Sequence, residues 1–553
     1  MSKAKIIRGI CLSCFIGTLF WSCTDVNEPN QNDTNDQDHI YAKFQQEKIF
    51  VLKDSGEISI HVNWSETEWE VKLKLGDFVT AISQTEGGNE LDQDQTTIIN
   101  LTYSQNKEPD YRTQKISITN KTTGQVSNLI LEQAPDGLKE YPVNIDPSVK
   151  YQHVVGFGGM YNPVIWTGSF LITNAELAKM YGPKGLGYSI LRLMIYPNKS
   201  NWEADVEAAR YAQQQGVVIF ASPWDCTDAL ADQITLNGEK VKHLKHENYG
   251  AYAQHLIDYI NFMKSKGVSI YAISIQNEPD MDFTYWKPNE VVNFVKQYGA
   301  FIRETGVKLM TPEACGTHPD YTDPILNDVQ AFDNTDILVG HFYQGFVNTE
   351  NNNYARKRYE YIIGLYDRLQ GKTFWMTEHL FNDGEKESDP SLWEFQKWQY
   401  NLNQLGKEII ESMKGNVSAY VYWYLKRFYG MMGDNDERSP VPSGEITKNG
   451  YIMSHFAKYA SNMTRIRATT LRNVTDLSVT AYVNEEGSEI TLVMINYSNE
   501  KTAVNIPVSG VTDVQAVETT QNKNMEEAEF RQLDNSIYLI LSEQSIVSVR
   551  LTL

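Results

Sequence analysis

The sequence predicts an α/β fold, a (β/α)8 TIM barrel with an attached C-terminal β-sandwich and a separate small N-terminal β-sandwich. Between about 150 and 450, eight short apolar runs alternate with longer amphipathic stretches, as strands and helices alternate in such a barrel. Before and after this region, apolar and polar residues alternate with a period of two, which is typical of strands exposed on one face. A chain of 553 residues is long enough for several domains.

Residues 1–23 are predicted to be a lipoprotein-type signal peptide. Basic residues precede the apolar stretch "ICLSCFIGTLFW", which is too short to serve as a stable membrane anchor. The small residue before Cys23 resembles a bacterial lipoprotein cleavage site, and an ordinary signal peptide cut nearby is the alternative. We expect export and a lipid on Cys23 that anchors the chain to the outer membrane or cell surface, with no other membrane contact.

The next two segments are predicted to be a tether and a small domain. Residues 24–43 are polar and acidic without apolar periodicity, which indicates a flexible acidic tether. Residues 44–136 alternate in short β-like runs and end in "LEQAP". This segment resembles a BACON domain, which implies a spacer or a weak carbohydrate contact, and we favour the spacer.

Residues 137–455 are predicted to form the barrel. Its strands are expected at 154–160, 188–195, 217–224, 270–278, 307–314, 336–343, 373–378 and 418–425. A doubly wound open sheet is the alternative, but it would carry a Gly-rich phosphate loop after its first strand. The run "GFGGM" lacks the spacing of such a loop, so the barrel is favoured.

Residues 456–553 are again β-like and are predicted to form the side β-sandwich, which the segment 141–148 is expected to join from the other side of the barrel. The formal charge of −21 argues against nucleic acid as a partner. Beyond the signal segment only Cys226 and Cys315 remain, so no disulfide scaffold or zinc motif is expected and both are interpreted as buried thiols.

Two glutamates end predicted barrel strands. Glu278 ends the fourth strand in "AISIQNEP", and Glu378 ends the seventh in "TFWMTE". In such a barrel the active site lies where the strands end, and strands four and seven face each other across the mouth. Two carboxyl groups about 5 Å apart form the arrangement of a retaining glycosidase. Either glutamate alone is equally typical of a solvated loop, but the pair predicts catalysis.

The neighbours of the two glutamates suggest their roles. Asn277 precedes Glu278 and is placed to bond the sugar hydroxyl beside the reacting carbon, so Glu278 is interpreted as acid/base and Glu378 as nucleophile. Arg192 lies in an apolar strand and needs a partner; we expect it near Glu378, and a structural salt bridge is the alternative. His341 and Tyr343 end strand six and are candidates to orient the nucleophile, although a core histidine fits equally.

Tryptophans at strand ends and in loops are candidate stacking platforms for sugar rings. Plain core packing is the alternative for each, and the two at strand ends, Trp224 and Trp423, are the better candidates. The four candidates are Trp166, Trp224, Trp286 and Trp423.

Several long stretches are together similar to glycoside hydrolase family 30, and among its subfamilies to the bacterial glucuronoxylanases of subfamily 8. The resemblance covers about 140–553. It is carried by "GFGGM", "LGYSILRLMIYPNKSNW", "FASPWD", "YAQHLIDYINFMKSKGVSIYAISIQNEPD", "TDPILNDVQAF", "WMTEHL" and "AYVYWYLKRFYG". It implies a retaining endo-β-1,4-xylanase that needs no cofactor or metal, with Glu278 as acid/base and Glu378 as nucleophile.

The resemblance also implies that a glucuronic acid branch on xylan is recognised. Trp423, Arg427 and Tyr429 match the positions that bind this branch, and a planar guanidinium can hold a carboxylate through two hydrogen bonds. The alternative for Arg427 is a salt bridge at the rim. Where the family often has Tyr and then a hydroxyl residue after the nucleophile, this chain has Leu380 and Phe381, so strict dependence on glucuronate is in doubt.

The sequence therefore predicts a monomeric, surface-tethered endoxylanase that acts on glucuronoxylan. The first alternative is a family 30 xylanase, or another β-glycanase, without glucuronate dependence. The second is a glycan-binding lipoprotein without catalysis, which would leave Glu278 and Glu378 unexplained.

Overall fold

The computed structural model describes residues 39–553 except 166–170, 183, 282, 344–352 and 472–473. The chain divides into two compact units, one ending at Pro135 and the other running from Asp136 to Leu553. The predicted signal peptide and most of the predicted tether lie outside the described residues. Across the part that is described, no helix is long and apolar enough to cross a membrane.

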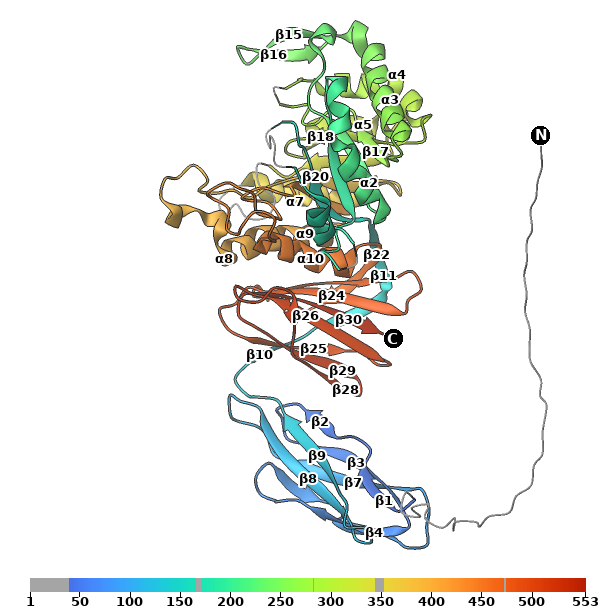
Figure 1. Cartoon of the computed structure of the whole chain (residues 1–553), viewed down its shortest axis with the longest axis vertical. Helices are drawn as coiled ribbons and strands as arrows, with labels where there is room; N and C mark the ends of the chain where they lie inside the picture. Colours follow the sequence, from blue (N-terminus) through green and yellow to red (C-terminus); the bar gives the residue numbers. More distant parts are fainter. Residues whose placement is uncertain (1–38, 166–170, 183, 282, 344–352, 472–473) are drawn as a thin grey trace, which may run out of the picture. The chain divides into compact units, whose positions relative to one another are not determined.

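The N-terminal unit consists of two sheets around one core (blue in Figure 1). One sheet has the order β1-β3-β7-β5 and the other β2-β9-β8-β4-β6. Inward residues alternate with outward ones: along β4, every second residue is buried and those between are exposed. The fully buried Trp69 on this strand packs in the core. The strands are β1 (Tyr41–Phe44), β2 (Lys48–Val51), β3 (Gly56–Ser65), β4 (Thr67–Lys72), β5 (Val79–Ile82), β6 (Glu86–Asn89), β7 (Gln95–Tyr103), β8 (Arg112–Asn120) and β9 (Val126–Gln133).

The second unit contains the predicted barrel, which the structure confirms as a closed ring of parallel strands. Each predicted strand overlaps an observed one. The strands are β12 (Gly156–Met160), β13 (Ile190–Ile195), β14 (Val218–Pro223), β17 (Ala272–Ser274), β18 (Lys308–Ala314), β19 (Ile337–His341), β20 (Thr373–Glu378) and β21 (Ala419–Tyr424). Phe220, Met310 and Trp375 are among the side chains that fill its centre, so the barrel is a packed core.

Helices cover the barrel and follow the apolar periodicity of the sequence. Pro288 begins α4, where a missing N–H costs nothing, and the backbone of Lys287 is capped by the Glu290 carboxylate. The helices are α1 (Asn174–Met180), α2 (Val206–Gln214), α3 (Tyr249–Ser265), α4 (Pro288–Arg303), α5 (Pro319–Asn327), α6 (Val329–Asn334), α7 (Asn353–Leu365), α8 (Trp398–Asn401), α9 (Lys407–Lys414) and α10 (Lys448–Ala460). Between β14 and α3 the chain forms the hairpin of β15 (Ala231–Leu236) and β16 (Glu239–Leu244).

The β-rich region after the barrel forms two further sheets. Helix α10 packs against β12 of the barrel and against β24 and β30 of the larger sheet. In Figure 1, α10 lies between the rest of the barrel and this sheet. Strands β10 and β11, which cover the segment 141–148, pair with β25 and β22. The strands are β10 (Lys139–Pro142), β11 (Asn144–Val154), β22 (Met463–Thr469), β23 (Leu477–Val483), β24 (Glu489–Asn496), β25 (Thr502–Pro507), β26 (Asp513–Thr519), β27 (Glu526–Glu527), β28 (Phe530–Leu533), β29 (Ser536–Leu541) and β30 (Ser545–Thr552).

Candidate active site

The two predicted catalytic glutamates lie at the carboxyl ends of barrel strands. Glu378 is the last residue of β20, and Glu278 follows β17 in a segment tied to the neighbouring strand ends. The Asn277 amide donates to the Pro223 carbonyl at 2.7 Å, and the Glu278 amide donates to the Glu313 carbonyl at 3.0 Å. Glu278 has a positive φ of 46°, a conformation that costs on the order of 1–3 kcal/mol and is concentrated at functional sites.

The two carboxyl groups meet across the barrel mouth. One carboxyl oxygen of Glu278, one of Glu378 and one ring nitrogen of His341 all lie within 4.8 Å of one another. Only the closed barrel brings these groups together, because they come from three different strand ends. The spacing leaves room for one sugar carbon and its leaving oxygen between the carboxyl groups, as in glycosidases with carboxyl groups about 5–5.5 Å apart.

Arg192 is the fully buried cation beneath this pair. Its guanidinium hydrogen-bonds Glu378 Oε2 directly, and Nη2 lies 2.5 Å from Asn277 Oδ1 and 3.1 Å from Glu313 Oε1. Burial disfavours the charged guanidinium, but Glu313 and Glu378 outweigh this and leave the pKa of Arg192 above its ordinary value. The ion pair expected from the sequence is therefore present, and it joins Glu378 to a further carboxylate.

That further carboxylate, Glu313, was not predicted from the sequence. It is fully buried on β18 and accepts hydrogen bonds from Arg192 and from the Ser222 hydroxyl at 3.0 Å. Burial raises its pKa, but the charges of Arg192 and His341 outweigh this and lower it below the ordinary value. A charged residue inside the apolar run "VKLMTPEA" is the signal that identifies it, the same signal that drew attention to Arg192.

His341 and Tyr343 contact the catalytic pair directly. His341 Nδ1 lies 2.9 Å from Glu278 Oε1 and 4.0 Å from Glu378 Oε2, and the Tyr343 hydroxyl donates to Glu378 Oε1 at 2.9 Å. Burial lowers the pKa of His341, but Glu378, Glu278 and Glu313 outweigh this and raise the pKa to about 9. The imidazole is therefore charged near neutral pH, and its Nδ1–H donates a hydrogen bond to Glu278 Oε1.

Glu378 has the surroundings of an anion. One of its oxygens receives the Arg192 guanidinium and the other receives the Tyr343 hydroxyl. Burial raises the pKa of Glu378 above the ordinary carboxyl value, and the charges of His341 and Arg192 oppose that rise. The cation below and the imidazolium beside it make this cluster a poor site for a metal ion, because a metal would add a third positive charge to the same small volume.

The predicted tryptophan platforms differ in position. Trp224 is buried and Trp423 is half-buried, with ring centroids 5.6 Å apart. Their rings lie 4.5 Å and 6.0 Å from the Arg192 guanidinium, so they form an aromatic wall of the site. Trp166 lies outside the described residues.

Trp286, one of the four candidate platforms, is packed in the core, which was the alternative given for each of them. Its side chain is 1% exposed, stacks on Tyr249 at 5.5 Å and packs edge-on against Phe294 at 5.4 Å. Its ring N–H is directed at Gln276 Oε1 at 3.3 Å. Trp286 therefore belongs to the core around α3 and α4, where no sugar ring can reach its face.

The residues matched to the branch pocket lie on one side of the mouth. Arg427 is half-buried and Tyr429 is buried, and the charge of Arg427 opposes the burial that raises the pKa of Tyr429. The Phe381 amide donates to the Tyr422 hydroxyl at 3.0 Å, and this hydroxyl donates to the Tyr429 carbonyl at 3.0 Å. The loop after Glu378, which carries the apolar Leu380 and Phe381, is thereby tied to the segment carrying Tyr429.

Known proteins resemble this chain in both sequence and fold. No family model matches the sequence. The chain is 35% identical over 371 residues to glucuronoxylanase XynC of Bacillus subtilis (strain 168), covering 66% of this chain and 80% of XynC. A GH30 endoxylanase from Clostridium papyrosolvens C71 is 30% identical with a TM-score of 0.62, covering 74% of this chain and 100% of that one. A glycoside hydrolase family 30 subfamily 8 xylanase, Xyn30A from Clostridium acetobutylicum, is 26% identical with a TM-score of 0.59 and the same coverage.

The charge on His341 predicts a pH dependence of stability. Its folded-state pKa of about 9 lies above the ordinary value of 6.5. The charged imidazole therefore stabilises the folded state fully below about pH 6.5, and this contribution is lost as the pH rises through about 9. Between these values we expect the Tm of the unmodified protein, measured by calorimetry, to fall more steeply than that of His341→Gln. The exposed His153→Gln variant serves as control and should follow the unmodified protein; parallel curves for all three proteins would contradict the assignment.

Proposed function

The chain belongs to glycoside hydrolase family 30, and on that premise we propose that it is a retaining endo-β-1,4-xylanase whose cleavage of glucuronoxylan is directed by a glucuronic acid branch. The relatives reported above are named as xylanases, which supports the enzyme class. The observation that carries the proposal is the approach of the Glu278 and Glu378 carboxyl oxygens to within 4.8 Å at the barrel mouth.

In this proposal Glu378 attacks the anomeric carbon while the bond to the leaving oxygen breaks and Glu278 gives its proton to that oxygen. A water molecule then attacks the same carbon, Glu278 takes the proton from the water, and Glu378 leaves. The roles follow from the surroundings: both oxygens of Glu378 accept hydrogen bonds, as an attacking anion requires. The Glu278 side chain is 12% exposed and can exchange protons with solvent and leaving group.

Asn277 is placed to hold the sugar between the two glutamates. Its Oδ1 is fixed by Arg192, so its Nδ2 group is turned away from the cation. This Nδ2 is buried and has no hydrogen-bond partner among the residues that the structure describes. An unpaired buried donor is costly, and the sugar hydroxyl next to the reacting carbon is the acceptor that the mechanism supplies.

The nucleophile assignment predicts the behaviour of Glu378→Gln. Glutamine keeps the shape but cannot form the glycosyl ester, so reducing-sugar release from glucuronoxylan should fall by more than about 1,000-fold. Glu387→Gln removes an exposed carboxylate from the same loop and should leave the rate unchanged. Undiminished release by Glu378→Gln would contradict the proposal.

Branch-directed cleavage rests on Arg427, Tyr429 and Trp423, and on the names of the relatives. A second candidate function is a xylanase that does not depend on the branch. The reason for it is the apolar pair Leu380 and Phe381, in the loop tied to Tyr429. Neither side chain can hydrogen-bond a glucuronate. If the branch is held, Arg427 must supply most of the attraction to its carboxylate.

Arg427→Ala distinguishes these two candidates. Losing a charge-assisted hydrogen bond costs about 1.5–3 kcal/mol, so kcat/KM on glucuronoxylan should fall about 10- to 100-fold while activity on unbranched xylan is unchanged. By mass spectrometry, each product of the unmodified protein should carry one glucuronate at a fixed position, and this pattern should be lost in the variant. Arg427→Lys keeps the charge without the planar fork and should be intermediate. Identical mixed products from all three proteins would favour the candidate indifferent to the branch.

We also propose that the protein is a monomer that acts outside the cell on this large substrate, held by a lipid on Cys23. The support is the signal-like segment 1–23 and the acidic tether 24–43. In this proposal the BACON-like residues 44–136 act as a spacer between anchor and barrel.

A further inference from the structure

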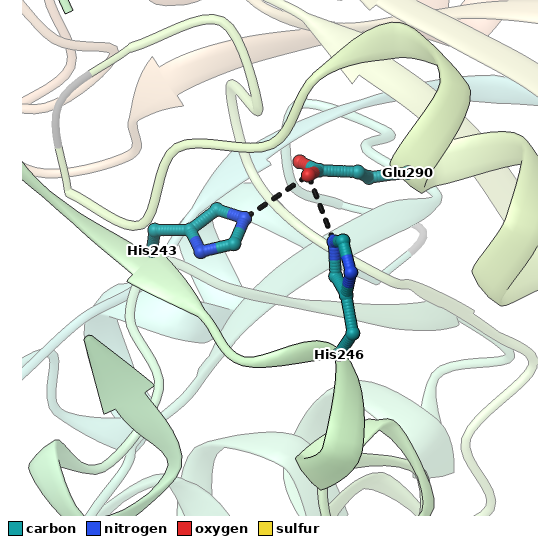
Figure 2. A group of neighbouring side chains, drawn as sticks. All are labelled: His243, His246 and Glu290. Carbon is teal, nitrogen blue, oxygen red and sulfur yellow. Dashed lines mark hydrogen bonds and ion pairs between the residues drawn. The ribbon is translucent and has the colours of Figure 1, made fainter. Parts of the chain in front are cut away.

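A second cluster of metal-binding side chain types lies outside the catalytic pair. His243 is on β16, His246 begins the short helical turn His246–Asn248, and Glu290 is in the first turn of α4. Both rings point at the same carboxylate (Figure 2). Glu290 Oε1 lies 3.2 Å from His243 Nε2 and 2.9 Å from His246 Nε2. The three donor atoms lie within 4.8 Å of one another.

The carboxylate in this cluster is fixed and buried. The Glu290 side chain is 4% exposed, and its Oε2 accepts a hydrogen bond from the Lys287 amide at 2.7 Å. That bond caps α4 and leaves Oε1 as the oxygen directed at the two rings. The His243 side chain is also buried, at 8% exposure, whereas that of His246 is 64% exposed. The cluster is therefore a preformed site with one side open to solvent.

His243 has a carboxylate oxygen at each of its two ring nitrogens, Asp232 at Nδ1 and Glu290 at Nε2. Its Nδ1 lies 2.8 Å from Asp232 Oδ1, so Nδ1 carries the proton in the neutral ring and Nε2 carries a lone pair. This lone pair faces Glu290 Oε1. Two acceptors at that distance repel each other unless a proton or a cation lies between them. A carboxylate on the far nitrogen is also the usual way in which a metal-bound histidine is oriented.

We propose that His243 Nε2, His246 Nε2 and Glu290 Oε1 bind one divalent transition-metal ion of the zinc type, with Asp232 orienting His243. Tetrahedral zinc with bonds of about 2.0–2.1 Å holds its ligand atoms about 3.3–3.4 Å apart. The two distances from Glu290 Oε1, 3.2 Å and 2.9 Å, are close to this separation, and the two ring nitrogens lie within 4.8 Å of each other. The exposed side of His246 gives solvent access to the fourth position.

The donor set selects the class of metal. Two imidazole nitrogens and one carboxylate oxygen suit zinc and its neighbours, whereas calcium and magnesium prefer oxygen ligands alone. With both rings neutral, Glu290 and Asp232 carry two negative charges, which a divalent cation balances. Nearby, Lys242 directs its ammonium group at Asp225 and Asp228, 3.0 and 2.7 Å away, and is thereby engaged outside the cluster.

The metal would fasten the β15–β16 hairpin to the start of α4. The segment between Glu278 and α4 already contacts this hairpin, since the Tyr285 amide donates to the Lys242 carbonyl at 2.8 Å. A bound ion would therefore stiffen the loop that follows the acid/base residue. Its expected effect is a higher Tm, because the ion binds the folded chain.

Zinc titration of the full chain, without a histidine tag and after treatment with a chelator, tests the proposal. By calorimetry and elemental analysis the unmodified protein should bind one equivalent of Zn²⁺, and zinc should raise its Tm. His246→Ala changes an exposed residue and should weaken binding by at least about tenfold and reduce the Tm increase at a given zinc concentration. Asp232→Asn keeps all three donors and should weaken binding about 10- to 100-fold. His153→Ala, which removes an exposed histidine elsewhere, should bind like the unmodified protein.

Two outcomes would overturn the proposal. The first is no zinc binding by the unmodified protein at millimolar Zn²⁺, which would mean that a proton on His243 Nε2 bridges the two acceptors. The second is one equivalent bound with unchanged affinity by His246→Ala, which would place the ion elsewhere on the chain. Hydrolysis of xylan is measured separately, so failure of the metal proposal leaves the proposed activity untouched.

Discussion

The buried guanidinium of Arg192 is the interaction on which the catalytic site depends. A charge with no exposure is tolerated only when it is paired and hydrogen-bonded, and its partners come from three other strand ends: Glu378, Glu313 and Asn277. These contacts hold Glu378 and Asn277, the residue before Glu278, in fixed positions. Removing one partner of a buried pair costs about 3–5 kcal/mol, so the same ion pairs that shape the site also hold the strands in register.

Charge balance follows from this arrangement. With Glu278 protonated, as the first chemical step requires, the cations Arg192 and His341 face the anions Glu313 and Glu378. Glu278 is hydrogen-bonded to His341 and lies on the solvent side of the pair. Glu378 is hydrogen-bonded to Arg192 and to the Tyr343 hydroxyl. Two carboxyl groups of the same residue type therefore have different surroundings, and the different roles proposed for them rest on this difference.

The sequence predicted the barrel because strand and helix periods are local signals, and it placed Glu278 and Glu378 because each follows such a strand. Glu313 carries the same signal as Arg192, a charge within an apolar strand. For Trp286 the sequence left sugar platform and core packing both open, since an aromatic residue in a loop does not reveal which side it packs on. The cluster of His243, His246 and Glu290 was equally hidden, because Glu290 lies 44 positions beyond His246 and only the packing of the hairpin against α4 brings them together.

The central claim, that Glu378 attacks the sugar while Arg192 holds it in place, is tested most directly by trapping the intermediate. A 2-deoxy-2-fluoro-xylobioside with a dinitrophenolate leaving group should form the glycosyl–enzyme but release it slowly, because fluorine destabilises both transition states and the good leaving group restores only the first step. The account predicts that the intact mass rises by one disaccharide unit, that the label is on the peptide containing Glu378, and that Glu378→Gln is not labelled. A label on Glu278, or hydrolysis of natural xylan with inversion and no adduct, would contradict it.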